Sequence, residues 1–128
     1  MELADRVELH ELPGRYGDFI DDRDWARLDR IFTEDATFDL TDLGVPMLRG
    51  LAEIQRFMAQ DADHPATHLM TNVYVDETDH DVRMSFRIVA LRKGRSVASA
   101  SYYDVVVKTA DGWRVKKRVT TLRRRPRE

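Results

Sequence analysis

The sequence has no cysteine among its 128 residues. This absence excludes a disulfide scaffold, a thiolate zinc site, an iron–sulfur cluster and a cysteine nucleophile. The chain also lacks any run close to the ~20 apolar residues that cross a bilayer. Its first residues, Met1–Arg6, are charged from the start and lack the apolar core of a signal peptide. We therefore expect a cytoplasmic protein with no membrane partner.

The sequence lacks several motifs that indicate a cofactor or a catalytic nucleophile. There is no glycine-rich phosphate loop, no HExxH zinc motif and no GxSxG elbow. His64 and His68 stand four positions apart, but Pro65 opposes a helix that would bring them together. The sequence thus predicts neither a metal site nor a bound cofactor.

Charge is unevenly distributed along the chain. Acidic residues outnumber basic ones 16 to 7 in residues 1–64, whereas basic residues outnumber acidic ones 14 to 7 in residues 65–128. The basic residues that close the chain, ending in the tail 123–128, could contact nucleic acid phosphates. No nucleic-acid recognition motif accompanies them, and the net charge is −2. We therefore interpret them as a solvated last strand and tail, and expect no nucleic acid partner.

The first half of the sequence has helical periodicity. Pro13 interrupts the first helical face, which predicts either a kink there or a new helix start. Asp24 has the chemistry of an N-cap for a second helix. The three predicted helices are one built on Leu9, Leu12, Tyr16, Phe19 and Ile20, one over Trp25 to Phe32, and one over Gly50 to Gln60 with Ile54, Phe57 and Met58 as its apolar stripe.

The second half alternates between apolar and polar residues, as strands with one buried face do. Asp111-Gly112 is a strong hairpin signal between the last two strands. Helices followed by antiparallel strands indicate an α+β fold and one domain over residues 1–122. The predicted strands cover residues 36–40, 67–75, 82–90, 97–108 and 113–122.

His68 is the residue that most suggests chemistry. It begins a largely apolar strand, where a buried imidazole needs a hydrogen-bond partner. Asp18 and Asp21 on the first helix are the candidate partners. By helical geometry Asp21 lies on the flank of the apolar stripe, whereas Asp18 points nearly opposite to it. A His–Asp pair in an apolar cavity can act as a general base, although a lone strand histidine can also be a structural residue.

The sequence resembles the SnoaL-like branch of the nuclear transport factor 2-like superfamily, across nearly its whole length. The matching residues are 15–25, Leu28, 31–39, Leu48 to Gly50, Ile54, Thr67 to Val73 and Asp111 to Val115. The resemblance implies a cone in which a curved, mixed, mostly antiparallel sheet wraps around about three helices and leaves one pocket. It also implies a small apolar or aromatic ligand and a homodimer formed through the sheet.

The nearest site pattern is that of scytalone dehydratase, and it falls on Asp21 and His68 as the catalytic pair. The resemblance thus implies a lyase or isomerase, such as a dehydratase, a cyclase or a ketosteroid-isomerase-like enzyme, acting on a cyclic or aromatic polyketide- or steroid-like substrate. Its carbonyl-polarising tyrosines fall on Ile20 and Leu40, which cannot donate a hydrogen bond. The oxyanion tyrosine of ketosteroid isomerase falls on Tyr16, but the aspartate base of that enzyme falls on Leu40.

These departures leave an alternative, namely a non-catalytic ligand-binding or assembly module with the same fold. In both cases Ser101 and Tyr103 are expected to face the pocket, with Tyr102 and Asp104 turned toward solvent or a dimer partner. The full set of predicted pocket residues is Tyr16, Ile20, Leu40, Phe57, Met70, Ser101 and Tyr103.

Overall fold

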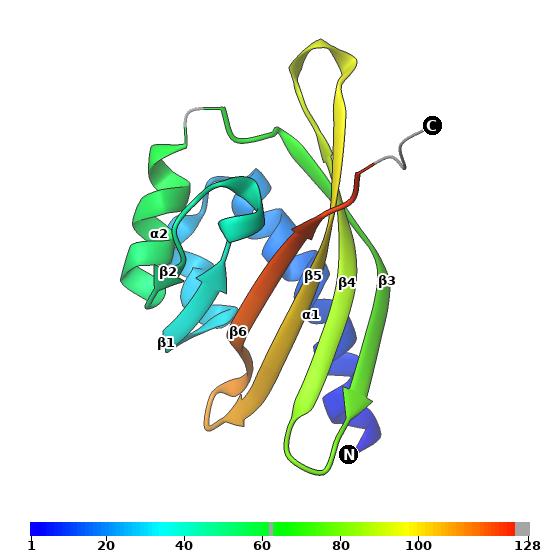
Figure 1. The fold of residues 1–128 in the computed structure, drawn as a ribbon. Helices are drawn as coiled ribbons and strands as arrows, with labels where there is room; N and C mark the ends of the chain where they lie inside the picture. The colour runs from blue at the N-terminus through cyan, green and yellow to red at the C-terminus, as the bar shows by residue number, and fades with distance from the viewer. Residues whose placement is uncertain (62, 125–128) are drawn as a thin grey trace.

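A computed structural model describes residues 1–61 and 63–124. In these ranges the helical segments precede most of the strands, as expected for an α+β fold. Figure 1 shows the long first helix running along the sheet, where it packs mainly against β3, with α2 lying next to β1. The helical segments are α1 (Leu3–Asp21), the 3₁₀ helices η1 (Trp25–Arg30), η2 (Thr41–Leu43) and η3 (Lys93–Arg95), and α2 (Leu51–Gln60).

The strands form one six-stranded mixed sheet in the order β2-β1-β6-β5-β4-β3. The β1–β6 pair is parallel and the remaining pairs are antiparallel. The sheet curves around the helices without closing, which confirms the predicted α+β cone (Figure 1). The strands are β1 (Phe32–Asp39), β2 (Leu48–Arg49), β3 (Thr67–Glu77), β4 (Val82–Leu91), β5 (Val97–Thr109) and β6 (Gly112–Leu122).

Helix α1 continues through Pro13 instead of restarting there. A proline inside a helix loses one backbone hydrogen bond and costs about 3 kcal/mol. Leu9, Leu12, Tyr16 and Ile20 on the same face are each 4% exposed or less. Because burying one such side chain contributes about 1.5–3 kcal/mol, packing against the sheet outweighs the local cost.

The predicted second helix is shorter than expected and is 3₁₀ rather than α. Asp24 stands at its N-cap position but makes no side-chain cap, because its carboxylate pairs with Arg27 at 3.0 Å. Phe32, predicted to end this helix, instead begins β1 and pairs with Val115 of β6. The parallel pairing with β6 therefore determines where the helix stops, and the sequence around Phe32 carries no local sign of it.

The register of the sheet decides which side chains face the helices. Phe86 of β4 lies opposite Tyr102 of β5, and Tyr102 lies opposite Thr120 of β6. Each of the three is 7% exposed or less. Residues directly opposite one another in an antiparallel pair share a face, so Tyr102 and Thr120 lie on the inner face with the core residue Phe86.

In the described part of the chain, no helix is long and apolar enough to cross a membrane. The basic tail predicted for 123–128 is described only at its first two residues. Arg123 donates to Ser101 Oγ at 3.1 Å, and Arg124 contacts Asp42 at 3.2 Å. Residues 125–128 lie outside the described ranges.

Candidate active site

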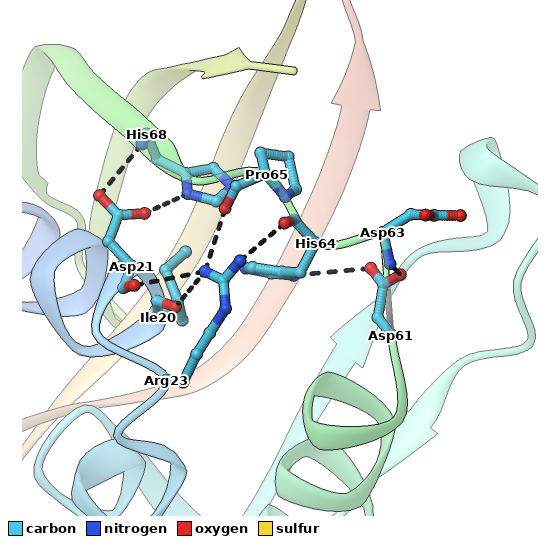
Figure 2. Close-up of polar contacts among 8 residues, drawn as sticks. All are labelled: Ile20, Asp21, Arg23, Asp61, Asp63, His64, Pro65 and His68. Carbon is cyan, nitrogen blue, oxygen red and sulfur yellow. Dashed lines mark hydrogen bonds and ion pairs between the residues drawn. The ribbon is translucent and has the colours of Figure 1, made fainter. Parts of the chain in front are cut away.

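His68 and Asp21 are held together by two hydrogen bonds. The Nδ1 of His68 lies 2.6 Å from Oδ1 of Asp21, and the backbone N–H of His68 donates to Oδ2 of Asp21 at 3.1 Å (Figure 2). The two side chains are 6% and 19% exposed, so water screens this contact only weakly. Since a carboxylate can only accept, Nδ1 is the donor in this contact, and in the neutral imidazole Nε2 is then left with its lone pair.

The end of helix α1 and the start of strand β3 create this contact. Asp21 is the last residue of α1, and His68 is the second residue of β3. Asp21 and His68 are thereby brought together although 47 positions separate them in the sequence. In the sheet His68 lies opposite Ala90, and Ala90 lies opposite Ala98, so the imidazole stands on the inner face beside two small side chains.

The imidazole lines a cavity of about 500 Å³. Ala90 and Ala98 line it too, together with larger apolar side chains from η2, α2 and the inner face of the sheet. No described residue hydrogen-bonds to Nε2 of His68, so this nitrogen is available to a molecule in the cavity. Apolar side chains predominate in the wall: Ile20, Phe38, Leu40, Leu43, Val45, Phe57, Met58, Ile88, Ala100 and Leu122.

Four of the seven predicted pocket residues line this cavity, namely Tyr16, Ile20, Leu40 and Phe57. Met70 does not. Its side chain packs against α1 at Gly17, where an added Cβ would lie 3.0 Å from Cε of Met70. Met70 therefore supports the helix that carries Asp21 and does not form part of the cavity wall.

The predicted orientation of Ser101 and Tyr103 is wrong. Both line a second, smaller hollow on the outer face of the sheet, and Tyr103 is 53% exposed. Tyr102 instead faces the main cavity. The sequence misleads here because β5 carries apolar and polar side chains on both faces, and Asp104, which shares the face of Tyr102, is charged but buried. Strand β4 alternates clearly between apolar and polar side chains, so its register with β5, if known, would have shown which face of β5 is buried.

Tyr16 and Tyr102 are the two tyrosines that line the cavity. Their rings meet edge to face, with centroids 6.2 Å apart. Burial raises the pKa of both hydroxyls, strongly for Tyr16, and the nearby Arg118 guanidinium opposes this rise. Both tyrosines are therefore protonated at neutral pH and can donate a hydrogen bond.

Arg118 and Asp104 form a fully buried ion pair next to these tyrosines. Two parallel hydrogen bonds of 2.9 Å join the guanidinium to the carboxylate, and both side chains are 0% exposed. Burial raises the pKa of Asp104. Burial alone would lower the pKa of Arg118, but the charge and hydrogen bonds of Asp104, together with Tyr16 and Tyr102, raise it. Five aromatic rings surround the guanidinium carbon at 4.4–5.4 Å: Tyr16, Phe32, Phe38, Phe86 and Tyr102.

Neither residue of this pair was predicted to be buried, because Arg118 falls in the basic last strand and Asp104 was expected to face solvent or a dimer partner. The pairing of β4, β5 and β6 would have shown that both residues are buried. Met84, Asp104 and Arg118 lie directly opposite one another on the inner face. A charged residue on a buried face needs an opposite charge beside it, and only the pairing of these strands supplies one.

His64 also lines the cavity, although the sequence pattern did not predict it there. Its ring centroid lies 5.0 Å from that of His68, and the edge of Trp25 packs against it. The side chain is 8% exposed, and its Nε2 is buried without a partner among the described residues. Burial, and then the neighbouring His68 and Arg23, lower the pKa of His64 below its usual value.

The residues of 1–61 and 63–124 contain no group of three or more His, Asp or Glu side chains placed to hold a metal ion. The polar residues that line the cavity are Tyr16, Asp61, Asp63, His64, His68, Arg92, Ser99, Tyr102 and Thr120. Such a set can bind an organic molecule, accept a proton at His68 and donate hydrogen bonds from tyrosine.

A family model described as a SnoaL-like domain matches residues 1–119. The chain belongs to the SnoaL-like family. Among relatives of this SnoaL-like domain is the uncharacterized protein Rv2910c of Mycobacterium tuberculosis, which is 32% identical over 94% of this chain and 86% of its own length.

Solved structures share the fold. An NTF2-like protein with a cystatin-like fold from Novosphingobium aromaticivorans has a TM-score of 0.81 and 23% identity, covering 94% of this chain and 82% of its own. A hexachlorocyclohexane dehydrochlorinase, LinA-type3 from Novosphingobium barchaimii, has a TM-score of 0.80 and 18% identity, covering 95% and 88%. These similarities establish the cystatin-like cone for this SnoaL-like domain.

Proposed function

We propose that this protein is a lyase or isomerase that removes a proton from carbon in a small cyclic or aromatic substrate of polyketide or steroid type. The observation that carries the proposal is the 2.6 Å contact of His68 Nδ1 with Asp21 at the wall of an apolar cavity. Nε2 of His68 accepts the proton, and the carboxylate of Asp21 stabilises the imidazolium that forms.

A carbonyl next to the reacting carbon must be polarised as the proton leaves. Ile20 and Leu40 contribute only apolar surface to the cavity, but Tyr102 supplies a donor that replaces them. In the proposed step the C–H electrons form an enolate and its oxygen accepts a hydrogen bond from Tyr102. A preorganised donor in a site from which water is excluded acts strongly on such a developing charge.

A non-catalytic binding module is favoured less by this interior. A buried histidine kept only for packing would also need a partner such as Asp21 at one ring nitrogen, but it would not need an open cavity beside its ring. One structural neighbour is named a dehydrochlorinase, which describes an elimination, a lyase-type reaction. That similarity shows the fold alone, so the proposal depends on the cavity itself.

The test uses two probes that report proton removal from carbon without the natural substrate. They are exchange of the α-protons of 2-tetralone in D₂O, followed by NMR, and ring opening of 5-nitrobenzisoxazole, followed by absorbance. His68→Ala should lower the protein-dependent rate about 10²–10⁴-fold while the fold persists. Equal rates for wild type and His68→Ala with both probes, at whatever level, would refute the proposal.

We also propose that two copies pair through the outer face of the sheet. Tyr74, Ser85, Tyr103 and Val119 lie opposite one another across β3 to β6. Tyr74, Tyr103 and Val119 are 60%, 53% and 43% exposed, an apolar row suited to a second copy. Light scattering should give a dimer mass for wild type and a monomer mass for Tyr74→Lys combined with Tyr103→Lys. A monomeric wild type would contradict the pairing.

A further inference from the structure

Helix α1 ends in a turn that normally contains glycine. The N–H of Arg23 donates to the carbonyl of Ile20 at 3.2 Å, and the N–H of Asp24 donates to the carbonyl of Phe19 at 2.8 Å. This bond pattern is the Schellman motif, in which the residue after the helix cap is left-handed. Arg23 occupies that position with φ +57°, which is unfavourable for a residue with a Cβ.

The side chain of Arg23 explains why an arginine stands there. Its guanidinium donates to four backbone carbonyls, two on each of two segments (Figure 2). Ile20 and Asp21, at the end of α1, accept at 3.0 and 3.3 Å. Pro65 and His64, just before β3, accept at 3.0 and 2.7 Å. Within the described chain the guanidinium is bonded only to carbonyl oxygens, and a cation also suits the C-terminal end of a helix.

The two segments joined in this way carry the candidate base and its carboxylate. Asp21 belongs to the first, and His68 lies three residues after Pro65 on the second. We propose that Arg23 is a positioning residue, a clamp that fixes the end of α1 against residues 64–65 and so sets the separation of Asp21 and His68. Its catalytic consequence rests on the proposed function, whereas its effect on the Asp21–His68 geometry does not.

The clamp also shapes the cavity. His64 and Pro65, whose carbonyls it holds, both line the cavity wall. Arg23 itself does not line the cavity. It acts on substrate only through these neighbours, by limiting how far the wall and the base can move. A displacement of the order of 1 Å between reacting groups can cost about 10²-fold in rate.

The decisive variant is Arg23→Gly, because glycine suits the left-handed backbone and the helix end should persist while the clamp is lost. Two readouts report the clamp without any substrate: hydrogen exchange of the His68 amide, which donates to Asp21, and the low-field NMR signal of His68 Nδ1–H. Both protons should exchange about tenfold faster in Arg23→Gly, and kcat for 5-nitrobenzisoxazole should fall about tenfold at an unchanged circular dichroism spectrum.

Arg23→Lys should restore part of both effects, since an ammonium can reach only some of the four carbonyls. The matched control is Arg27→Lys, at an exposed arginine whose ion pair with Asp24 lies outside the clamp. It should leave both readouts unchanged.

The two proposals fail in different ways. Unchanged His68 protons and kcat in Arg23→Gly would overturn the clamp and leave the proposed function standing. Faster exchange in Arg23→Gly, with wild type and His68→Ala equally inactive on the probe, would support the clamp and overturn the proposed function.

Discussion

The side chains of His68 and Asp21 contact one another at 2.6 Å between Nδ1 and Oδ1, from the start of one strand and the end of one helix. This contact fixes the tautomer of the imidazole and leaves Nε2 at an apolar cavity. Because His68 lines this cavity and Asp21 does not, the role proposed for each group can be tested by its own substitution.

Asp21→Asn removes the negative charge but keeps the size of the side chain. An amide can donate to Nδ1, which places the proton on Nε2, and it stabilises an imidazolium poorly. We expect the rate of proton removal to fall about 10²-fold, with less effect in the His68→Ala background because the two groups act together. Histidine ¹⁵N shifts should report the changed tautomer. Additive losses in the double variant would contradict a shared role.

Tyr102→Phe and Tyr103→Phe form a matched pair at adjacent positions. Tyr102 faces the cavity and Tyr103 the outer face, so only the first substitution removes a donor from the site. Loss of one such donor should lower kcat for α-proton exchange of 2-tetralone about 10²–10³-fold in Tyr102→Phe. Tyr103→Phe should match wild type. The reverse ranking would show that the carbonyl is bound elsewhere.

Removing one partner of the Arg118–Asp104 pair should be strongly destabilising. Arg118→Met or Asp104→Leu alone leaves an uncompensated charge at a fully buried position, at a cost of about 3–5 kcal/mol in the free energy of unfolding. The double variant removes both charges and should recover most of that loss. Urea unfolding of the four proteins measures this coupling, and a double variant as unstable as the sum of its parents would contradict it.

The lowered pKa of His64 predicts a pH-dependent stability. Its pKa is lower in the folded than in the unfolded protein, so the unfolded chain binds more protons between the two values. The stability contributed by neutral, buried His64 is complete above the ordinary pKa of about 6.5 and falls as pH drops toward the folded value.

His64→Gln should therefore flatten the decline in urea midpoint between about pH 7 and about pH 5. His80, which lies on the surface, provides the control. In His80→Gln the urea midpoint should change with pH as it does in wild type. Identical slopes in all three proteins would mean that His64 is not the group responsible.

Local patterns in the sequence were sufficient for the α+β class and for five of the six described strands, but not for β2 or for the start of β1. They offered His68 with Asp18 or Asp21 as candidates, and the resemblance selected Asp21. The apolar helical face of Leu9, Leu12, Tyr16 and Ile20 is buried as predicted. Such a face is removed from water in the folded protein, whichever element packs against it. The helical wheel correctly left Asp21, and not Asp18, within reach of the interior. The resemblance to SnoaL-like proteins supplied the curvature of the sheet, which periodicity does not contain.

Only the tertiary structure decided which face of β5 is inside. Alternate residues of a strand point to opposite faces, and both sets of residues in β5 include apolar side chains. Which set faces inward therefore depends on the register with Phe86 of β4 and Thr120 of β6. The same register buries Arg118 against Asp104, which composition alone places at the surface. The contact of Arg23 with the carbonyls of residues 64–65 is likewise long-range. The sequence shows only an exposed arginine, and not which carbonyls lie around it.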